Sequence, residues 1–466
     1  MNKSERILPT IKAETAAALT CLSTDAPMPP FFKSLLIMRQ RLHAENEASD
    51  SVWHIVCGKL LLAGINEMAE THPLWADILK SHYIDRMTMR GSAQKLGYDN
   101  RYRVDREQRK AIDRLADILL AWEQNARQQQ VAQLLRSLDK EPTYDTLFGA
   151  EEQVERLKQA LLAPDHAWLI AVTVLGGFGK TAVADQTIRQ IIPTLHFQQI
   201  VAVYLEPGNL PLANLRALLA RQLGLPTASE AETERQLVQC LRSRPSLVFI
   251  DGFEDDISHL EEGLSKWANP SKILITSRHR PVISHTFFAQ PITSLPMTAV
   301  ADLIRQHARK IGRMELAAAT DEQIGLIHHK VGGNPLALKL IVGLSDKHTI
   351  PAILNDLTEL KIEAKIEEMY RRIYWQAWRA LSSESQTVLK AMQIPDSAAG
   401  ANLAYIASLC PGLDLRAVSA AIEDLINRSL LETHGSAWEA HMRYRIHSLT
   451  KTFLQTEIIH YPDEYL

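Results

Sequence analysis

Apolar runs alternate with helical patterns through the middle of the chain. Continuous runs rich in β-branched residues begin at Leu169 and Ile200. Two further runs end at Asp251 and Arg278, and apolar residues recur every three or four positions between the runs. Strands that alternate with helices form parallel sheets covered on both faces. The pattern therefore predicts one α/β domain over residues 141–296.

The chain after this domain has mainly a helical pattern. Residues 297–364 carry periodic Leu, Ile and Ala with a break at Gly332 and Gly333, which predicts a helical lid. Residues 365–466 are also mostly helical. Near their end, LLETHGSAWEAHMRYRIHSL predicts two short strands followed by a helix, which is typical of a winged helix.

The chain before the α/β domain is helical over residues 1–140. The polar stretch ARQQQ at 126–130 and the segment EPTYD from Glu141 predict the junction with the α/β domain. From Ile78 the pattern is a helix, a short break, a second helix and a longer third helix, which predicts a helix-turn-helix over about residues 77–122.

Glycines after the first apolar run predict a phosphate-binding loop. The run continues as VLGGFGKTAVA, in which Gly176, Gly177 and Gly179 precede Lys180 and Thr181 at the start of a helix. In such a loop, backbone N–H groups surround the phosphates, the Lys reaches the β- and γ-phosphates and the Thr hydroxyl binds Mg²⁺. We therefore predict ATP or ADP with Mg²⁺ as ligands. A glycine-rich βα turn without a ligand is the alternative.

A second group of candidate site residues follows the run SLVFID. Asp251 stands where NTPases of this kind present a carboxylate to Mg²⁺. The next residue is Gly252 rather than a second acid, so Glu254 or Asp255 would have to polarise water, and hydrolysis is expected to be slow. A solvated helix start is the alternative for these two acids. Val174 stands where the loop pattern usually has Gly, which leaves the hydrolysis rate open.

The run KILITSR ends with a cation. Arg278 lies just beyond this strand, where its guanidinium can reach a γ-phosphate and act as a sensor; an ordinary surface Arg is the alternative. The candidate catalytic residues are thus Lys180, Asp251, Arg278 and Glu254, and the candidate metal ligands are Thr181 and Asp251.

The order of these motifs resembles the NB-ARC branch of the STAND ATPases, a class of signal-transduction NTPases. LFGAEEQVERL is similar to the family's entry motif, which implies that Phe148 and Gly149 lie near the adenine. GGNPLAL is similar to its lid motif, which implies that Pro335 packs against the adenine, although the pattern alone predicts only a helix stop and restart. YRIHSL is similar to its winged-helix motif, which implies that His447 contacts the β-phosphate of ADP; a buried core His is the alternative.

The resemblance implies a switch that exchanges ADP for ATP and then assembles into a homo-oligomer for signalling. A bacterial DNA-binding regulator or defence-type protein with slow ATPase activity is the leading hypothesis. A DNA-loading or remodelling AAA+ ATPase is the second, and a non-hydrolysing scaffold with a protein-binding N-terminal part is the third. The signal or sensor partner stays unidentified.

The N-terminal helix-turn-helix resembles region 4 of bacterial sigma factors. Its third helix has a cationic side that fits the phosphates and base edges of double-stranded DNA. A basic adaptor helix that binds protein is the alternative. The candidate DNA-binding residues are Asn100, Arg101, Arg103, Arg106, Arg109 and Lys110.

The predicted fold class is multidomain and mainly α, with one α/β domain. A P-loop parallel sheet (141–296) is followed by a helical lid (297–364) and a winged helix (365–466), and is preceded by an all-α helix-turn-helix module (1–140).

Composition is that of an ordinary globular protein, with 46% hydrophobic and 23% charged residues and a net charge of -3. The four cysteines, Cys21, Cys57, Cys240 and Cys410, are isolated from one another, so neither a zinc site nor a disulfide framework is expected. Neither a signal peptide nor a membrane span is apparent, and we expect a cytoplasmic protein.

Overall fold

The chain forms two compact units, Met1–Gln133 and Leu134–Leu466. The computed structural model describes residues 3–24, 27–43, 49–98, 101–138, 140–142, 144–164, 166–173, 177–205, 212–226, 229–253, 260–277, 287–346, 348–358, 366–395, 400–428, 430–434, 442–446 and 448–459. No helix in these ranges is both long enough and apolar enough to cross a membrane.

The first unit is a helical bundle, and α4 contributes Val56, Leu60 and Leu61 to its buried core. A Cβ at Gly64 of α4 would lie 2.7 Å from Leu115 Cδ1, so the absence of a side chain at Gly64 leaves room for Leu115 of α7. Glu123 of α7 is buried and accepts hydrogen bonds from the N–H groups of Leu36 and Ile37 at the start of α3. The elements are α1 (Lys3–Ser23), α2 (Pro30–Ser34), α3 (Leu36–His43), α4 (Asp50–Thr71), α5 (Pro73–Leu79), the π-helical turn η1 (Lys80–Ile84), α6 (Met89–Lys95) and α7 (Arg101–Arg136).

Helix α7 is longer than the sequence pattern predicts. The stretch 126–130, which we expected to mark the junction between domains, lies inside this helix. Ala, Arg and Gln are good helix formers, so a polar stretch made of them continues a helix. The break before α6 lies at Thr88, whose hydroxyl accepts from the N–H of Gly91. Assignment of this region as a helix-turn-helix stays a prediction.

A five-stranded parallel sheet forms the centre of the second unit, in the order β2-β3-β4-β1-β5. All five residues of β1 and all six of β4 are buried, as expected for strands with both faces covered. The predicted fold class, mainly helical with one parallel α/β sheet, is confirmed. The strands are β1 (Leu169–Thr173), β2 (Gln199–Tyr204), β3 (Ser246–Phe253), β4 (Lys272–Ser277) and β5 (Phe287–Pro291).

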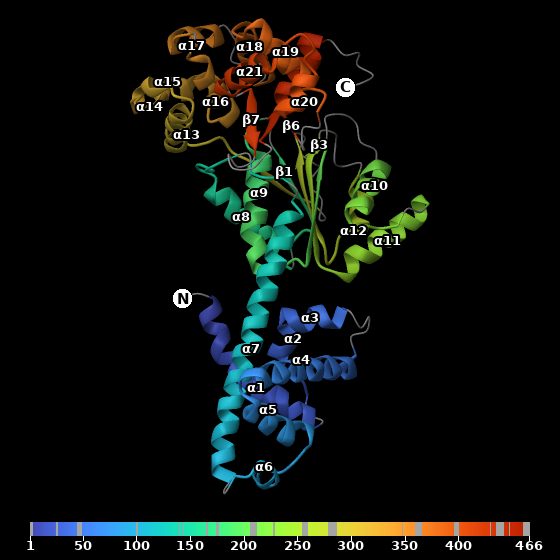
Figure 1. Ribbon diagram of the computed structural model, residues 1–466. Helices are drawn as coiled ribbons and strands as arrows, with labels where there is room; N and C mark the ends of the chain where they lie inside the picture. Colours follow the sequence, from blue (N-terminus) through green and yellow to red (C-terminus); the bar gives the residue numbers. More distant parts are fainter. Residues whose placement is uncertain are drawn as a thin grey trace. The chain divides into compact units, whose positions relative to one another are not determined.

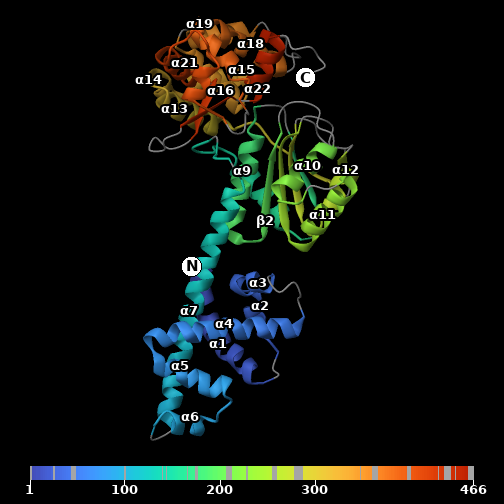
Figure 2. The ribbon, with the colours of Figure 1, turned by 45° about the vertical axis from the view of Figure 1, so that its right-hand side comes forward.

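Helices cover both faces of this sheet (Figure 1). The pair α8 (Glu151–Leu162) and α9 (Lys180–Ile191) lies on one face, and α9 continues into the short η2 (Ile192–Thr194). Figure 2 shows the opposite face, covered by α10 (Leu212–Gln222), α11 (Glu230–Ser243) and α12 (Glu261–Trp267). In sheets of this kind, ligands bind outside the carboxyl ends of the strands, among the loops that follow them.

The sequence analysis missed strand β5. Its sequence FFAQP is short, has no alternation of apolar and polar residues and ends in Pro291. Among the described strands, β1 is its single partner, and proline is tolerated at such an edge because no further ladder hydrogen bond is required there.

The remaining helices share one hydrophobic core. Ile341 and Val342 of α16 belong to the same buried cluster as Ile373 of α18 and Leu425 of α21. A Cβ at Gly343 would lie 2.6 Å from the carbonyl oxygen of Arg428, so the two parts are in close contact. The lid elements are α13 (Met297–Lys310), α14 (Met314–Ala317), α15 (Asp321–Val331), α16 (Pro335–Leu344) and α17 (Ile350–Thr358).

The C-terminal elements combine helices with a three-stranded antiparallel sheet in the order β6-β8-β7. The winged-helix assignment stays a prediction. The elements are α18 (Ile366–Arg379), α19 (Ser383–Ala391), β6 (Ala401–Asn402), α20 (Leu403–Ser408), α21 (Leu415–Asn427), β7 (Leu431–His434), β8 (Arg443–Ile446), α22 (Ser448–Phe453) and the π-helical turn η4 (Leu454–Ile459).

Candidate functional site

The loop between β1 and α9 adopts a backbone conformation that favours glycine. Gly177 and Gly179 have φ angles of 82° and 85°, in the left-handed region where a side chain would be strained. Gly179 is the N-cap of α9, so no N-cap side chain covers the first N–H groups of this helix. Lys180 and Thr181 then form its first turn. These N–H groups and the Lys are suited to bind an anion.

Two hydroxyl groups meet the carboxylate of Asp251, a residue that is only 8% exposed. Thr181 Oγ1 donates to Asp251 Oδ1 over 2.7 Å, and Thr276 Oγ1 donates to the same oxygen over 2.6 Å. Carboxylate and hydroxyl oxygens are the ligands that Mg²⁺ prefers. The residues present therefore fit a divalent cation held by Thr181 and Asp251.

The lid approaches the loop through the first turn of α16. Asn334 caps this helix, because its side-chain oxygen accepts from the N–H groups of Leu336 and Ala337 at 3.1 and 3.2 Å. The N–H of Leu336 also contacts the carbonyl oxygen of Gly177 at 3.3 Å. Pro335, at the first position of the helix, is thereby placed against the glycine loop.

The segment before α8 turns sharply at Gly149, which has a φ of +61°. A Cβ at this position would lie 2.6 Å from Ala299 Cβ of α13. Gly149 does not itself line the cavity described next, but it fixes the turn between Phe148 and Ala150, which do.

A cavity of about 320 Å³ joins these groups. Its walls come from the β1–α9 loop, the end of β3, lid helices α13 and α16, and strand β8. The volume lies within the range of small-molecule sites. The predicted residues that line it are Gly177, Gly179, Lys180, Thr181, Asp251, Phe148 and Pro335.

Sequence reasoning missed several cationic or titratable residues that also line the cavity, among them His307, Lys310, Lys339 and Arg445. Lys310 pairs with Asp145 at 2.6 Å, and this contact lowers the pKa of the Asp145 carboxyl. Burial, together with the positive charges of Lys339 and Lys310, lowers the pKa of His307 to about 4. The lid side of the cavity thus carries positive charge on Lys310, Lys339 and Arg445.

Helix periodicity could have identified some of these residues once one neighbour on the same helix was assigned to the site. Lys339 lies four residues after Pro335 on α16, and His307 lies three residues before Lys310 on α13, so each pair shares a helix face. Arg445 lies on strand β8, whose sequence RYRI precedes the predicted His447 in the chain.

Five predicted site residues, Gly176, Glu254, Arg278, His447 and Asn100, lie outside the described residues. Arg101 begins α7, and its side chain is not described.

The candidate DNA-binding residues follow the exposed side of α7. Arg103, Arg106, Arg109 and Lys110 are all exposed. Arg109 pairs with Asp105 at 3.2 Å and Lys110 with Glu107 at 2.8 Å, so part of the positive charge is neutralised within the helix. Arg103 lies over the ring of Tyr98 at 5.6 Å. Tyr102, which the sequence analysis did not single out, is 71% exposed beside them.

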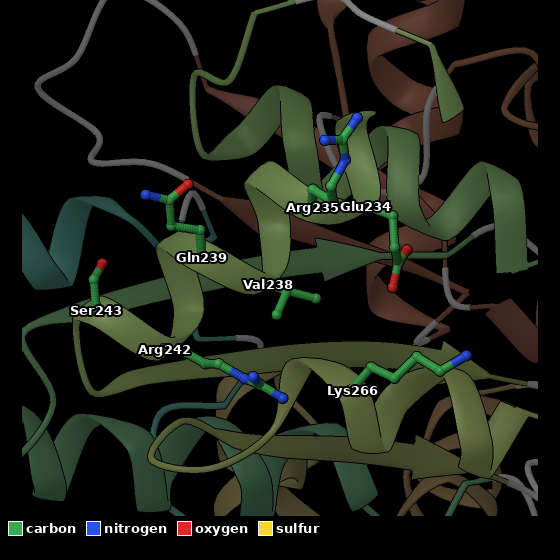
Figure 3. Close-up of a pocket in the computed structure, with 7 residues that line it drawn as sticks. All are labelled: Glu234, Arg235, Val238, Gln239, Arg242, Ser243 and Lys266. Carbon is green, nitrogen blue, oxygen red and sulfur yellow. The ribbon is translucent and has the colours of Figure 1, made fainter. Parts of the chain in front are cut away.

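A shallow groove lies between α11 and α12 on the outer face of the sheet layer (Figure 3). Val238 of α11 and Lys266 of α12 lie on opposite sides of it. Arg235 pairs with Glu232 at 2.6 Å and Lys266 with Glu262 at 3.3 Å. The described candidate residues lie elsewhere, and we assign this groove no role.

Comparison with known proteins supports an NTPase domain at this site. Residues 150–294 match the family model of the NB-ARC domain. An uncharacterized WD repeat-containing protein of Nostoc sp. is 22% identical over 229 residues, which are 43% of this chain and 18% of that protein. TMV resistance protein N of Nicotiana glutinosa is 26% identical over 207 residues, 42% of this chain and 18% of that protein. The chain thus spans less than a fifth of the length of these two relatives.

Two solved structures resemble the chain at low sequence identity. A signal transduction ATPase with numerous domains and a tetratricopeptide repeat sensor, from Pyrococcus horikoshii, is 14% identical, with a TM-score of 0.45 over 70% of this chain and 44% of that one. The ORC2 protein of Aeropyrum pernix, in ADPNP and ADP complexes, is 13% identical, with a TM-score of 0.35 over 70% of this chain and 98% of that one.

Proposed function

We propose that this chain, a STAND-type P-loop NTPase whose residues 150–294 form an NB-ARC domain, is a switch controlled by the nucleotide in the cavity. One observation carries the proposal. The glycine loop, the end of β3, the lid helices and strand β8 line a single cavity. A ligand that contacts all of them favours the arrangement in which they lie close together over one in which the lid lies apart from the loop. The shift in free energy equals the difference in the ligand's binding free energy for the two arrangements.

Different residues of the cavity bind different parts of the nucleotide. Lys180 and the first N–H groups of α9 bind the β- and γ-phosphates, and Thr181 with Asp251 holds Mg²⁺, which supplies positive charge beside those phosphates. Pro335 and Phe148 provide apolar surface for the base. In this proposal ADP favours the arrangement in which the lid and β8 lie close to the glycine loop, and His447 contacts its β-phosphate.

Positive charge on the lid side supports a phosphate-bearing ligand. Lys339 of α16 and Arg445 of β8 face the same cavity as Lys180, so three cations from three segments lie around one volume. Cations attract the negative charge of a di- or triphosphate, so their grouping around one volume favours such a ligand. Exchange for ATP, sensed by Arg278, then releases the lid side for self-association and signalling. Hydrolysis, with Glu254 as the candidate for polarising water, is expected to be slow.

Binding of fluorescent ADP and ATP to purified protein tests this proposal. Lys180→Ala removes a charged contact with the phosphates and is expected to weaken binding by about 10- to 100-fold. Lys266→Ala, an exposed Lys of α12 in the groove of Figure 3, is the matched control and should bind like the wild type. Equal affinity of the wild type and Lys180→Ala would contradict the proposal.

Size-exclusion chromatography of ADP- and ATP-loaded protein tests the switch, since one common elution volume argues against nucleotide-dependent assembly.

A second activity, DNA binding by the N-terminal unit, is favoured by one feature of α7. Tyr102, Arg103 and Arg106 form an exposed aromatic and cationic patch at the start of a helix. Cations of this kind contact phosphates, and a side chain at a helix start reaches base edges in the major groove. We propose that the unit binds double-stranded DNA in the manner of a bacterial regulator or defence-type protein.

A further inference from the structure

Strand β3 contains an irregularity at the candidate metal site. Ile250 pairs with Ile275 of β4, but the next registered pair is Phe253 with Ser277. Asp251 and Gly252 therefore lie opposite the single residue Thr276. This is a β-bulge, a feature that re-aims side chains and is frequent beside active sites. Gly252 has a φ of +84°, which fits the extra residue of such a bulge.

The bulge turns a backbone donor toward a side chain. The N–H of Gly252 donates to Thr276 Oγ1 over 2.9 Å. The Thr276 hydroxyl has one hydrogen, and a backbone N–H cannot accept it. The hydrogen therefore goes to Asp251 Oδ1, 2.6 Å away. The direction of this short relay is fixed by the chemistry of its groups.

The relay adds a second hydrogen-bond donor to the Asp251 carboxylate. Thr181 Oγ1 donates to Asp251 Oδ1 from α9, and Thr276 donates to the same oxygen from β4. Thr276 is 1% exposed, so no solvent replaces its hydroxyl. With Oδ1 engaged twice, the rotation of the carboxylate is restricted before any cation arrives. Groups that orient a metal ligand in this way typically change metal affinity by about 10- to 100-fold when removed.

We propose that Thr276 is a positioning residue for Mg²⁺: its hydroxyl, fixed by the Gly252 N–H, holds Asp251 in the orientation that binds the cation. In this role Thr276, which also lines the cavity, acts on the cation through Asp251. The proposal rests on the proposed function, because it assumes that Mg²⁺ and a nucleotide bind together at Thr181 and Asp251.

Fluorescent ADP binding, measured in EDTA and at rising Mg²⁺ concentration, tests the proposal. Thr276→Val keeps the β-branched shape and removes the hydrogen bond to Asp251. In EDTA this variant should bind ADP within about twofold of the wild type, while the Mg²⁺ concentration for half-maximal effect should rise about 10-fold. Thr276→Ser keeps the hydroxyl and should restore the wild-type Mg²⁺ response.

A matched control separates this effect from the loss of any buried hydroxyl. Thr187→Val removes a fully buried hydroxyl that bonds to the Val183 carbonyl oxygen within α9, and its Mg²⁺ response should equal that of the wild type. Should Thr276→Val not fold, Thr276→Cys, whose thiol is a poor donor, should shift the Mg²⁺ response in the same direction.

Three outcomes overturn the proposal. A folded Thr276→Val with a wild-type Mg²⁺ response shows that the hydroxyl does not position the carboxylate. A Thr276→Ser that behaves like Thr276→Val shows that the hydroxyl is not the responsible group. Wild-type protein that binds no ADP in either condition refutes the proposed function itself, and this inference with it.

Discussion

His307 illustrates how the cavity controls the state of one side chain. It is partly buried on α13, with Lys310 one turn away on the same helix and Lys339 on α16. Burial and the two positive charges oppose protonation and lower the pKa of His307 to about 4. Asp145, which also lines the cavity, pairs with Lys310. The imidazole is therefore neutral at physiological pH.

This shift predicts a loss of stability in acid. In the unfolded chain His307 has a pKa near 6.5, so between pH 6.5 and 4 the unfolded state binds more protons than the folded state. The contribution of His307 to the free energy of unfolding is complete above pH 6.5 and falls by up to about 3 kcal/mol as the pH drops through 4. Urea unfolding of wild type and His307→Gln over this range should show a smaller decline for the variant.

The control for this measurement is His329→Gln, which changes an exposed His on α15 outside the cavity. Its stability should follow the wild-type curve. Identical slopes for wild type and His307→Gln between pH 6.5 and 4 would show that His307 is not held neutral in the folded protein.

At the residue scale, the sequence predicts those groups whose role is local. Lys180 and Thr181 follow from the glycine loop because loop, Lys and helix start are neighbours along the chain. Lys339 and Arg445 face the cavity only because α16 and β8 approach the loop from distant parts of the chain. Thr276 was passed over for a related reason: its partners lie on β3, and a bulge directs them.

At the scale of the element, α7 offers a test of DNA binding. Arg103→Glu combined with Arg106→Glu reverses two exposed charges and should weaken binding to duplex DNA by about 10-fold or more, with a shallower salt dependence. Arg136→Glu at the other end of the same helix is the control. Fluorescence anisotropy at several salt concentrations provides the measurement. Unchanged affinity of the double variant would favour the protein-binding alternative.

Helices and strands were predictable to the extent that their own residues determine them. The four apolar runs became β1 to β4 because strands buried on both faces are continuously hydrophobic. Strand β5 was not predictable, since its pairing with β1 rather than its composition makes it a strand. The polar stretch 126–130 lies within α7, because residues without an apolar period still extend a helix when their propensity is high.

At the scale of the whole molecule, the common core of the lid and the C-terminal elements is the feature that the sequence could not indicate. Hydrophobic periodicity shows that each helix has an apolar face, but not which faces meet. Residues from Leu295 to Leu454 belong to one buried cluster, whereas the sheet has a cluster of its own. Arg428 strengthens the junction: its guanidinium bonds Asp424 at 2.7 Å and contacts Asp346, two residues after α16, at 3.4 Å.

Two glycines of the lid helices provide a test of this common core. Gly343→Ala would press a methyl group against the backbone of Arg428 and should destabilise the protein by about 1–3 kcal/mol. Gly325→Ala, whose Cβ would have only Met297 Cε within 4 Å, should be neutral or stabilise by up to about 1 kcal/mol. Hydrogen exchange should show that Gly343→Ala loosens both α16 and α21. Loosening of α16 alone would show that the two parts are independent.

The continuity of that core also limits how the molecule can be shortened. A fragment that ended after α17 would leave the side of α16 that packs on α18 facing water, although every residue of the glycine loop would be present. Such a fragment is expected to aggregate, since contiguous apolar surface of this kind is rarely tolerated in solution. The smallest piece that retains a formed ligand cavity therefore extends at least through β8.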